Sequence, residues 1–182
     1  MPPDAPKLRK PVVLVGMMGA GKSAVGLALA QLLGVDFLDS DDAMVEAANM
    51  SIAEIFERDG EDFFRARETE VIDRLLTGKP AIVSTGGGAF MAERNRILIA
   101  EKAVTVWLKA DLELLWNRVK HKTTRPLLRT DNPRRTLGEI FETRTPIYAL
   151  ADLAVNARDD YSIEDMARAV MAALQEAGIV GQ

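Results

Sequence analysis

"PVVLVGMMGAGKS" at residues 11–23 decides the fold class of this chain. It begins with an apolar run typical of a buried strand, and its last eight residues fit the pattern G-x-x-x-x-G-K-[ST]. Glycines let the backbone curl so that successive N–H groups point at phosphate oxygens, and a following helix adds its positive dipole end. We therefore predict a phosphate-binding loop between a strand and a helix, with Lys22 on the β- and γ-phosphates and Ser23 on Mg²⁺. The alternative, a glycine-rich turn without a ligand, would not need this strand and helix context.

Length and composition suit one α/β domain. The chain has 182 residues, of which 48% are hydrophobic and 27% charged, and no stretch approaches the roughly 18 apolar residues of a membrane span. "KLRK" before an apolar run is similar to the start of a signal peptide, but Lys22 and Ser23 interrupt the run and no cleavage site is clear. We expect a cytoplasmic protein. With no cysteine and one histidine, thiolate and His-based metal sites are excluded, and any metal should be a hard ion held by oxygen.

Short β-rich runs alternate along the chain with segments of helical periodicity, which predicts a parallel sheet with helices on both faces. The expected strands are 12–15, 35–38, 81–84, 104–108 and 153–155. Serine or threonine with an acid three residues later marks three helix starts: Ser51 with Glu54, Thr136 with Glu139, and Ser162 with Asp165. We expect residues 1–10 to form a flexible tail and 11–182 a single domain.

Charge is concentrated in one segment. Residues 118–135 contain seven basic residues and one acid, a net +6 within a chain whose net charge is −4. A cationic segment on an acidic body favours a small anionic ligand over a nucleic acid, which needs a broad basic face. The prolines and arginines of "TTRPLLRTDNPRR" indicate a mobile lid at about 120–135, and His121 within it is expected to be a surface residue.

Acidic residues follow the second expected strand in "FLDSDDAM". Open α/β sheets bind ligands at the carboxyl ends of their strands, where Asp39, Asp41 and Asp42 would lie. One of Asp39 and Asp41 could hold the waters of a metal ion and the other contact an attacking hydroxyl. The simpler interpretation is that these acids only cap the next helix.

An arginine and a glycine run complete the candidates. Arg65 and Glu68 share a helical face, so the carboxylate could orient the guanidinium, although an isolated helix arginine is usually solvated. In "STGGGAF" three consecutive glycines follow the third strand and would let the backbone approach a ligand closely, although a plain loop is the alternative.

Together these motifs resemble the shikimate kinase family over about residues 12 to 177. The resemblance rests on six segments in the family's order and approximate spacing: "GMMGAGKS", "FLDSDD", "SIAEIFERDGEDFFRARE", "STGGGA", "TTRPLL" and "TRTPIY". It implies an α/β fold similar to P-loop nucleoside-monophosphate kinases. Such a fold has a five-stranded parallel sheet with helices on both faces, a substrate-binding helical segment at about 40–70 and a mobile lid at about 120–135.

The resemblance also implies an activity: ATP-dependent phosphorylation of the 3-hydroxyl of shikimate, on the route to chorismate and the aromatic amino acids. The implied catalytic residues are Lys22, Asp41 and Arg125. The implied ATP-binding residues are Gly19, Ala20, Gly21, Lys22, Ser23, Ala24, Arg118, near the adenine, and Arg125. The implied substrate-binding residues are Asp41, Arg65, Gly86, Gly87, Gly88, Arg144, Phe56 and Phe64. Mg²⁺ would be held by Ser23 and, through water, by Asp39.

Three other functions fit parts of the sequence. A gluconate kinase could share the phosphate loop, but the combination of Arg65, Arg144 and the glycine run argues against it. A GTP-binding switch would need an N-K-x-D signature, which is missing after the later strands. An inactive interaction module would not need Lys22 and Ser23. We expect a monomer with ATP and shikimate as its small-molecule partners, and neither a nucleic acid nor a membrane.

Overall fold

A five-stranded parallel sheet forms the centre of the protein, and the computed structural model describes residues 6–121 and 128–181. Its spatial order is β3-β4-β2-β5-β6. The strands are β2 (Val12–Val15), β3 (Phe37–Asp39), β4 (Ile82–Ser84), β5 (Val104–Lys109) and β6 (Leu153–Asn156). The predicted fold class is therefore confirmed. The central strand, β2, is buried on both faces, which explains its uninterrupted run of valine and leucine.

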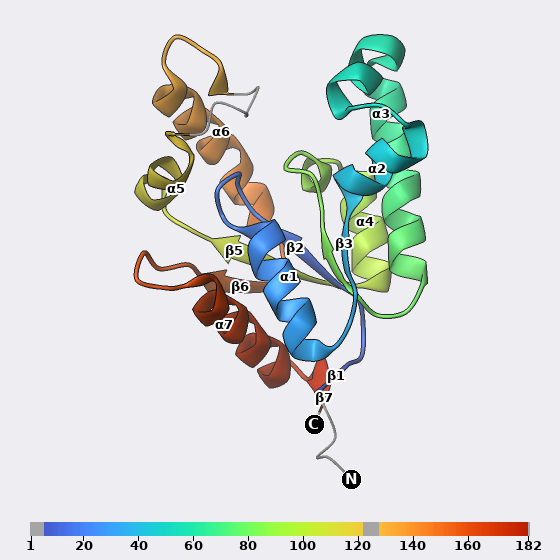
Figure 1. Ribbon diagram of the computed structural model, residues 1–182, viewed down its shortest axis with the longest axis vertical. Helices are drawn as coiled ribbons and strands as arrows, with labels where there is room; N and C mark the ends of the chain where they lie inside the picture. The colour runs from blue at the N-terminus through green and yellow to red at the C-terminus, as the bar shows by residue number, and fades with distance from the viewer. Residues whose placement is uncertain (1–5, 122–127, 182) are drawn as a thin grey trace.

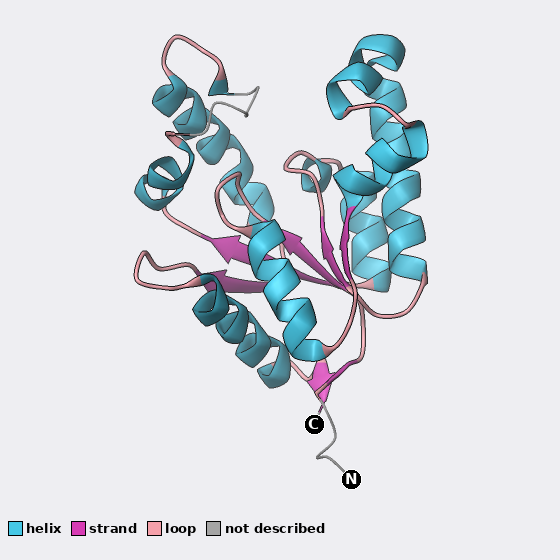
Figure 2. Cartoon of the chain, viewed as in Figure 1, coloured by secondary structure: helices cyan, strands magenta, loops and turns pink. Residues whose placement is uncertain are grey.

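Helices cover both faces of the sheet. Helices α1 (Lys22–Leu33) and α7 (Ile163–Glu176) pack together on one face, while α4 (Glu93–Lys102) lies with α3 (Ile52–Thr77) on the other (Figure 1). Two helical arms rise beyond the carboxyl ends of the strands (Figure 2). One contains α2 (Ser40–Ala48) and the first half of α3, and the other contains α5 (Leu112–Val119) and α6 (Pro133–Tyr148).

The α2–α3 arm has a small apolar core of its own. Met44, Ile55, Phe64 and Val71 are buried in it, separately from the main core around the sheet. At Gly60 the backbone of α3 leaves helical geometry with φ 85°, a conformation that favours glycine, so the helix folds back at that point. The arm is therefore a compact unit held at the edge of the sheet.

Two of the three predicted helix starts are confirmed. The side chains of Ser51 and Ser162 each accept a hydrogen bond from the backbone N–H three residues later. In turn, the carboxylates of Glu54 and Asp165 accept one from the backbone N–H of the cap serine. The prediction at Thr136 is wrong, because α6 begins one turn earlier. There the side chain of Asn132 accepts from the backbone of Arg135, and Pro133 occupies a first-turn position that needs no N–H donor.

Other expected boundaries also move. The second strand begins at Phe37 instead of residue 35, because the N–H of Val35 donates to the carbonyl of Ala30 and closes the end of α1. Residues 7 and 8 of the expected flexible tail form strand β1 (Lys7–Leu8), which pairs antiparallel with β7 (Val180–Gly181). Leu8 and Val180 are both buried, so apolar burial accounts for this pairing.

The expected lid is described only in part. Residues 133–135 belong to the first turn of α6. Residues 122–127, which include the predicted catalytic residue Arg125, lie outside the described residues.

Gly26 provides a test of how α1 packs on the sheet. A Cβ at Gly26 would lie 2.5 Å from the ring of Phe37 and 3.1 Å from Leu14, whereas one at Gly138 in α6 would meet only Leu112 at 3.7 Å. Overpacking costs about 1–3 kcal/mol, more than the 0.5–1 kcal/mol or so that alanine gains in a helix. We expect Gly26→Ala to lower the free energy of unfolding in urea and Gly138→Ala to raise it. A stabilised Gly26→Ala would contradict the packing described here.

Candidate active site

The loop after β2 has the shape of a phosphate cradle. Gly16, Gly19 and Gly21 all have positive φ angles, of 151°, 86° and 94°. A Cβ at Gly16 would lie 3.0 Å from the carbonyl oxygen of Leu108, and one at Gly19 would lie 2.8 Å from Val119, so neither position has room for a side chain. The loop leads directly into α1, whose N-terminal N–H groups favour anions. This geometry matches the interpretation of residues 16–23 as a phosphate-binding loop.

Two cations are positioned by the carbonyls of this loop. The Nζ of Lys22 donates to the carbonyl of Gly16 at 2.6 Å. Arg118, from α5, donates to the carbonyls of Gly19 and Ala20 at 3.0 and 3.3 Å. The predicted nucleotide residues Arg118 and Lys22 therefore both lie against the same loop, although they are far apart in sequence. Ser23 and Ala24 are exposed in the first turn of α1.

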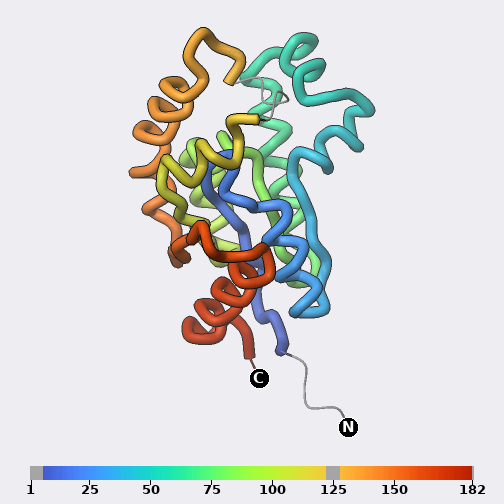
Figure 3. The backbone as a smooth tube through the Cα atoms, turned by 60° about the vertical axis from the view of Figure 1, so that its left-hand side comes forward, coloured from blue at the N-terminus to red at the C-terminus, as the bar shows by residue number. Residues whose placement is uncertain are grey.

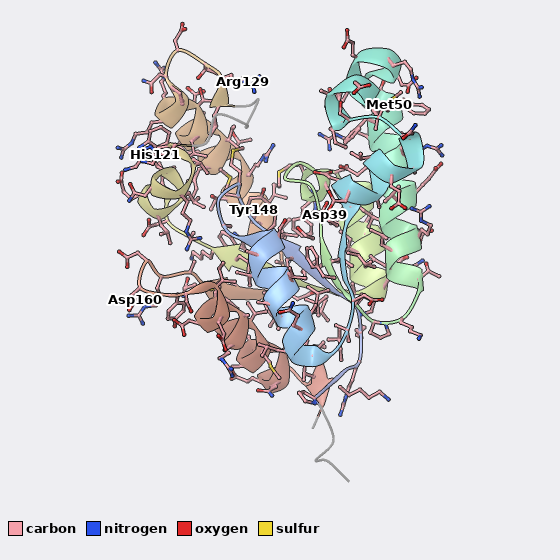
Figure 4. The ribbon with its side chains drawn as sticks, in the orientation of Figure 1. Asp39, Met50, His121, Arg129, Tyr148 and Asp160 are labelled. Carbon is pink, nitrogen blue, oxygen red and sulfur yellow. The ribbon has the colours of Figure 1, made fainter. Side chains whose placement is uncertain are left out.

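The acidic residues predicted opposite the phosphates lie where β3 meets α2. Asp39 caps α2, accepting a hydrogen bond from the N–H of Asp42 at 3.0 Å, so a capping role is present for this residue beside any role toward a ligand. The pKa of Asp39 is raised. Burial is the largest cause of this rise, and the positive charge of Lys22 acts in the opposite direction. Asp42 is exposed. Figure 4 shows Asp39 at the carboxyl edge of the sheet.

The pKa of Asp41 is raised from 3.8 to about 6. Burial is the largest cause, followed by the negative charges of Asp39 and Glu68, while Lys22 lowers the pKa. A carboxyl group with a pKa in this range can both hold and release a proton near neutral pH, as a catalytic base requires.

The three-glycine loop after β4 brings the other predicted substrate residues together. A Cβ on Gly86 would lie 2.7 Å from Oδ1 of Asp41. A Cβ on Gly87 would lie 2.8 Å from Nη1 of Arg144, and one on Gly88 would lie 2.9 Å from Nη2 of Arg65.

Each glycine thus faces a charged side chain from a different helix: α2, α6 or α3. The glycines are needed for this close approach, because side chains here would displace all three charged groups.

Two hydrogen bonds from neighbouring helices fix the backbone of this glycine loop. The N–H of Gly86 donates to the hydroxyl of Ser40 at 3.2 Å, and the hydroxyl of Tyr148 donates to the carbonyl of Gly87 at 2.9 Å. The sequence analysis missed both residues. Ser40 directly precedes Asp41, and Tyr148 stands one helical turn after Arg144 in "TRTPIY", so their proximity to predicted site residues was the available signal.

The guanidinium of Arg65 is held on several sides. Its Nη1 donates to both carboxylate oxygens of Glu68, at 3.0 and 3.2 Å, as the helical spacing predicted. Its Cζ lies 5.3 Å from the centre of the Phe64 ring, which in turn stacks on Phe56 with centroids 4.3 Å apart. Phe64 is buried beneath Arg65, so it supports the guanidinium through the apolar core of the arm.

Three further observations concern residues outside this region. His121 is exposed, as predicted, and lies on the α5–α6 arm (Figure 4). Among residues 6–121 and 128–181, no helix is long and apolar enough to cross a membrane. The same residues contain no group of three or more His, Cys, Asp or Glu side chains placed to hold a metal.

A phosphate-binding loop, carboxylates beside its lysine and two arginines on a glycine loop define a P-loop kinase for a small acidic metabolite. Comparison with known families identifies the kinase more narrowly: the shikimate kinase family model matches residues 18–175. The chain belongs to the shikimate kinase family. The resemblance inferred from the sequence is confirmed, and the chain is an enzyme for the ATP-dependent phosphorylation of shikimate in the shikimate pathway.

Individual relatives agree with this assignment. The chain is 64% identical to a shikimate kinase of Ruegeria pomeroyi over 93% of this chain and 87% of that protein. It is 61% identical to one of Cereibacter sphaeroides, over 92% and 84% of the two chains. The structure of a shikimate kinase from Acinetobacter baumannii in complex with shikimate superimposes with a TM-score of 0.84 at 35% identity, covering 92% and 94% of the two chains.

The raised pKa of Asp41 predicts a pH-dependent gain in stability when its charge is removed. Because this pKa is higher in the folded protein than in the unfolded chain, ionisation costs stability above pH 6, and the cost disappears toward pH 4. We expect Asp41→Asn to raise the free energy of unfolding by about 1–2 kcal/mol at pH 7.5, allowing for solvent screening, and by less at pH 5.5.

Urea titrations at the two pH values provide the measurement. Asp42→Asn is the matched control: Asp42 is exposed on the same helical turn and is only a minor source of the repulsion on Asp41, so its gain should be clearly smaller. A gain for Asp41→Asn that did not depend on pH would rule out this electrostatic account.

Proposed function

We propose that this enzyme transfers the γ-phosphoryl group of ATP to the 3-hydroxyl of shikimate at the glycine loop of residues 86–88. The observation that carries the proposal is the convergence of Asp41, Arg144 and Arg65 on three successive glycines. One carboxylate and two guanidiniums on a bare backbone match a small ligand that has hydroxyl groups and one carboxylate.

The two arginines are proposed to bind the shikimate carboxylate. Arg65 faces Gly88 and Arg144 faces Gly87, so their guanidiniums come from opposite arms to adjacent residues of one loop. Paired guanidiniums suit a carboxylate because their N–H groups match its two oxygens. The solved shikimate complex of the Acinetobacter baumannii relative supports a site for that substrate in this fold.

Asp41 is proposed to bind the reacting hydroxyl, and its pKa near 6 suits a group that accepts the proton as the phosphoryl group moves. Lys22 would contact the β- and γ-phosphates and offset the charge that develops on them. Arg118, on the loop carbonyls, would lie near the adenine. Arg125 is proposed to act from the lid, but it lies outside the described residues, so this role rests on the family resemblance alone.

The donors present fit Mg²⁺. Ser23 offers a hydroxyl at the end of the phosphate loop, and Asp39 offers a carboxylate at the end of β3, two strands from β2 but within the influence of Lys22. Asp39 raises the pKa of Asp41, and a nearby cation would offset that repulsion. Mg²⁺ favours few protein ligands together with water and phosphate oxygens, so we propose that Ser23 binds it directly and Asp39 through water. When bound, the ion would neutralise charge on the phosphates.

We further propose that the enzyme acts as a monomer in the cytoplasm, on ATP and shikimate alone. Asp41, Arg65 and Arg144 converge on one loop of the same chain, so a single copy already brings the proposed substrate-binding groups together. A net charge of −4 is poorly suited to a nucleic acid or an anionic membrane surface.

A coupled assay for ADP release tests the reaction. With ATP we expect turnover on shikimate, and none on gluconate or without an acceptor; with GTP, turnover on shikimate should be weaker. Lys22→Ala should reduce turnover by about 10³-fold or more, because it removes a charge that faces the phosphates. Its circular dichroism spectrum should match that of the unchanged enzyme. A Lys22→Ala rate within threefold of wild type would contradict the proposed role of the loop.

Arg65 and Arg144 are tested by their effect on each substrate. Arg65→Ala and Arg144→Ala should each weaken shikimate binding by about 1.5–3 kcal/mol, the scale of a charge-assisted hydrogen bond. Calorimetric titration should show ATP affinity nearly unchanged. If a shikimate analogue without its carboxylate were phosphorylated as efficiently as shikimate by the wild-type enzyme, the arginine pair would not be a carboxylate clamp.

A further inference from the structure

A buried asparagine on α4 joins the glycine loop to the arginine of the proposed carboxylate clamp. Asn95 is 0% exposed, although asparagine is mostly a surface residue. Its amide contacts a side chain of α3 on one side and the backbone after the glycine loop on the other. No sequence motif singles it out.

The orientation of this amide is fixed by the carbonyl of Ala89, which only accepts, so the NH₂ group must face it. The Oδ1 atom then faces Thr69, whose hydroxyl lies 2.6 Å from Oδ1 and 3.1 Å from the carbonyl oxygen of Arg65. The NH₂ group, on the opposite side, donates to the carbonyl of Ala89 at 2.9 Å and to Oε1 of Glu68 at 3.4 Å. Both amide hydrogens and the amide oxygen have partners, as a buried amide requires.

Glu68 connects the amide of Asn95 to Arg65 by hydrogen bonds. Its carboxylate is 1% exposed and accepts two hydrogen bonds from Arg65 in addition to that from Asn95. Burial raises the pKa of Glu68, while Arg65, Asn95 and Arg94 act in the opposite direction and favour the charged form. Each donor on this carboxylate therefore helps to keep it in the state that holds the guanidinium.

The amide of Asn95 also fixes the glycine loop, which is the other side of the contact between Gly88 and Arg65. Ala89 directly follows Gly88, and Gly88 is the glycine that faces the guanidinium of Arg65. Asn95 is thus bonded both to the residue next to Gly88 and to the carboxylate that orients Arg65. One side chain sets the relative position of the two surfaces between which the carboxylate of the substrate would bind.

We propose that Asn95 is a positioning residue for substrate binding, which acts through Glu68 on Arg65 and through Ala89 on the glycine loop. The inference rests on the proposed role of Arg65. It predicts an effect on shikimate affinity, without one on ATP, because the hydrogen bonds of Asn95 lead to Thr69, Glu68 and Ala89, which lie on α3 and after the glycine loop.

Two variants test the proposal in different ways. Asn95→Ala removes the amide. Thr69→Val keeps the volume of the side chain but removes the hydroxyl that bonds to Oδ1 of Asn95 and to the carbonyl of Arg65. We expect each to raise the KM for shikimate by about 3–10-fold, with kcat and the KM for ATP changed by less than about twofold, the pattern of lost ground-state binding. Thr69 is only half-buried, so its variant should fold even if Asn95→Ala does not.

Thr105→Val is the matched control for a purely structural effect. Thr105 is buried at the beginning of β5, near the opposite edge of the sheet from the site. Its hydroxyl accepts from the N–H of Asp152 at 2.7 Å and lies 3.2 Å from the Asp152 carboxylate. Losing these bonds should lower the melting temperature without moving the KM for shikimate. An equal rise in that KM for Thr105→Val would overturn the proposal, since it would show that lost stability alone produces the effect.

A double-mutant cycle then identifies the route of the effect. In an Arg65→Ala background, Thr69→Val and Asn95→Ala should raise the KM for shikimate by less than about twofold, because the group that they position is missing. The same 3–10-fold rise in that background would overturn the inference while leaving the role of Arg65 intact. If Arg65→Ala alone left shikimate binding unchanged, the proposed clamp would be wrong, and the inference would fall with it.

Discussion

The close approach of charged side chains to a bare backbone is the constraint on which the site depends. Asp41, Arg144 and Arg65 can reach residues 86–88 only because those residues have no side chains. These three side chains come from α2, α6 and α3, which connect to different strands of the sheet. The sheet order β3-β4-β2-β5-β6 places the glycine loop beside the phosphate loop, since β4 and β2 are neighbours. The parallel topology therefore creates the site, and the glycines allow it to close around a ligand.

The buried carboxylates of the site lower the stability of the folded protein. Asp39, Asp41 and Glu68 lie close enough that burial and mutual repulsion raise the pKa of Asp41, and burial raises those of the other two. Lys22 and Arg65 only partly offset this effect. Active sites commonly keep such unfavourable charges because they are used on a ligand or on developing charge. The positive charge of a bound metal ion would further offset the repulsion among these carboxylates.

Local patterns predicted most of the fold because each had a distinct physical cause. The glycines of residues 16–23 and the valines of 12–15 specify a loop and a buried strand, and Ser51 and Ser162 cap helices by hydrogen bonds made within one turn. The predicted element boundaries were wrong where a competing interaction was stronger. Helix α6 begins at Pro133 with Asn132 as its cap, before Thr136. The N–H of Val35 bonds to the end of α1, so Val35 does not belong to β3.

Contacts between distant segments could not be predicted in this way. Asn95 lies 27 residues from Glu68 and Tyr148 lies 61 from Gly87, and no periodicity connects such positions. Asp41 and Arg65 stood out by their positions after a strand and on a helix, and Arg144 by resemblance alone. Only the fold shows that the three meet at one loop. Which side chains support a site is therefore a property of the packed structure, whereas the residue types that could carry the chemistry are visible in the sequence.

The pairing of β1 with β7 has a consequence for the ends of the chain. Lys7 lies opposite Gly181 and Leu8 opposite Val180, so both ends leave the protein at one place (Figure 3). This place is at the far end of the molecule from the two helical arms (Figure 1). Joining the two ends by a short linker and opening the chain at an exposed loop would keep every strand in its place, since neighbouring termini make such rearrangements tolerable. A fusion partner attached at either end would likewise stand clear of the two helical arms.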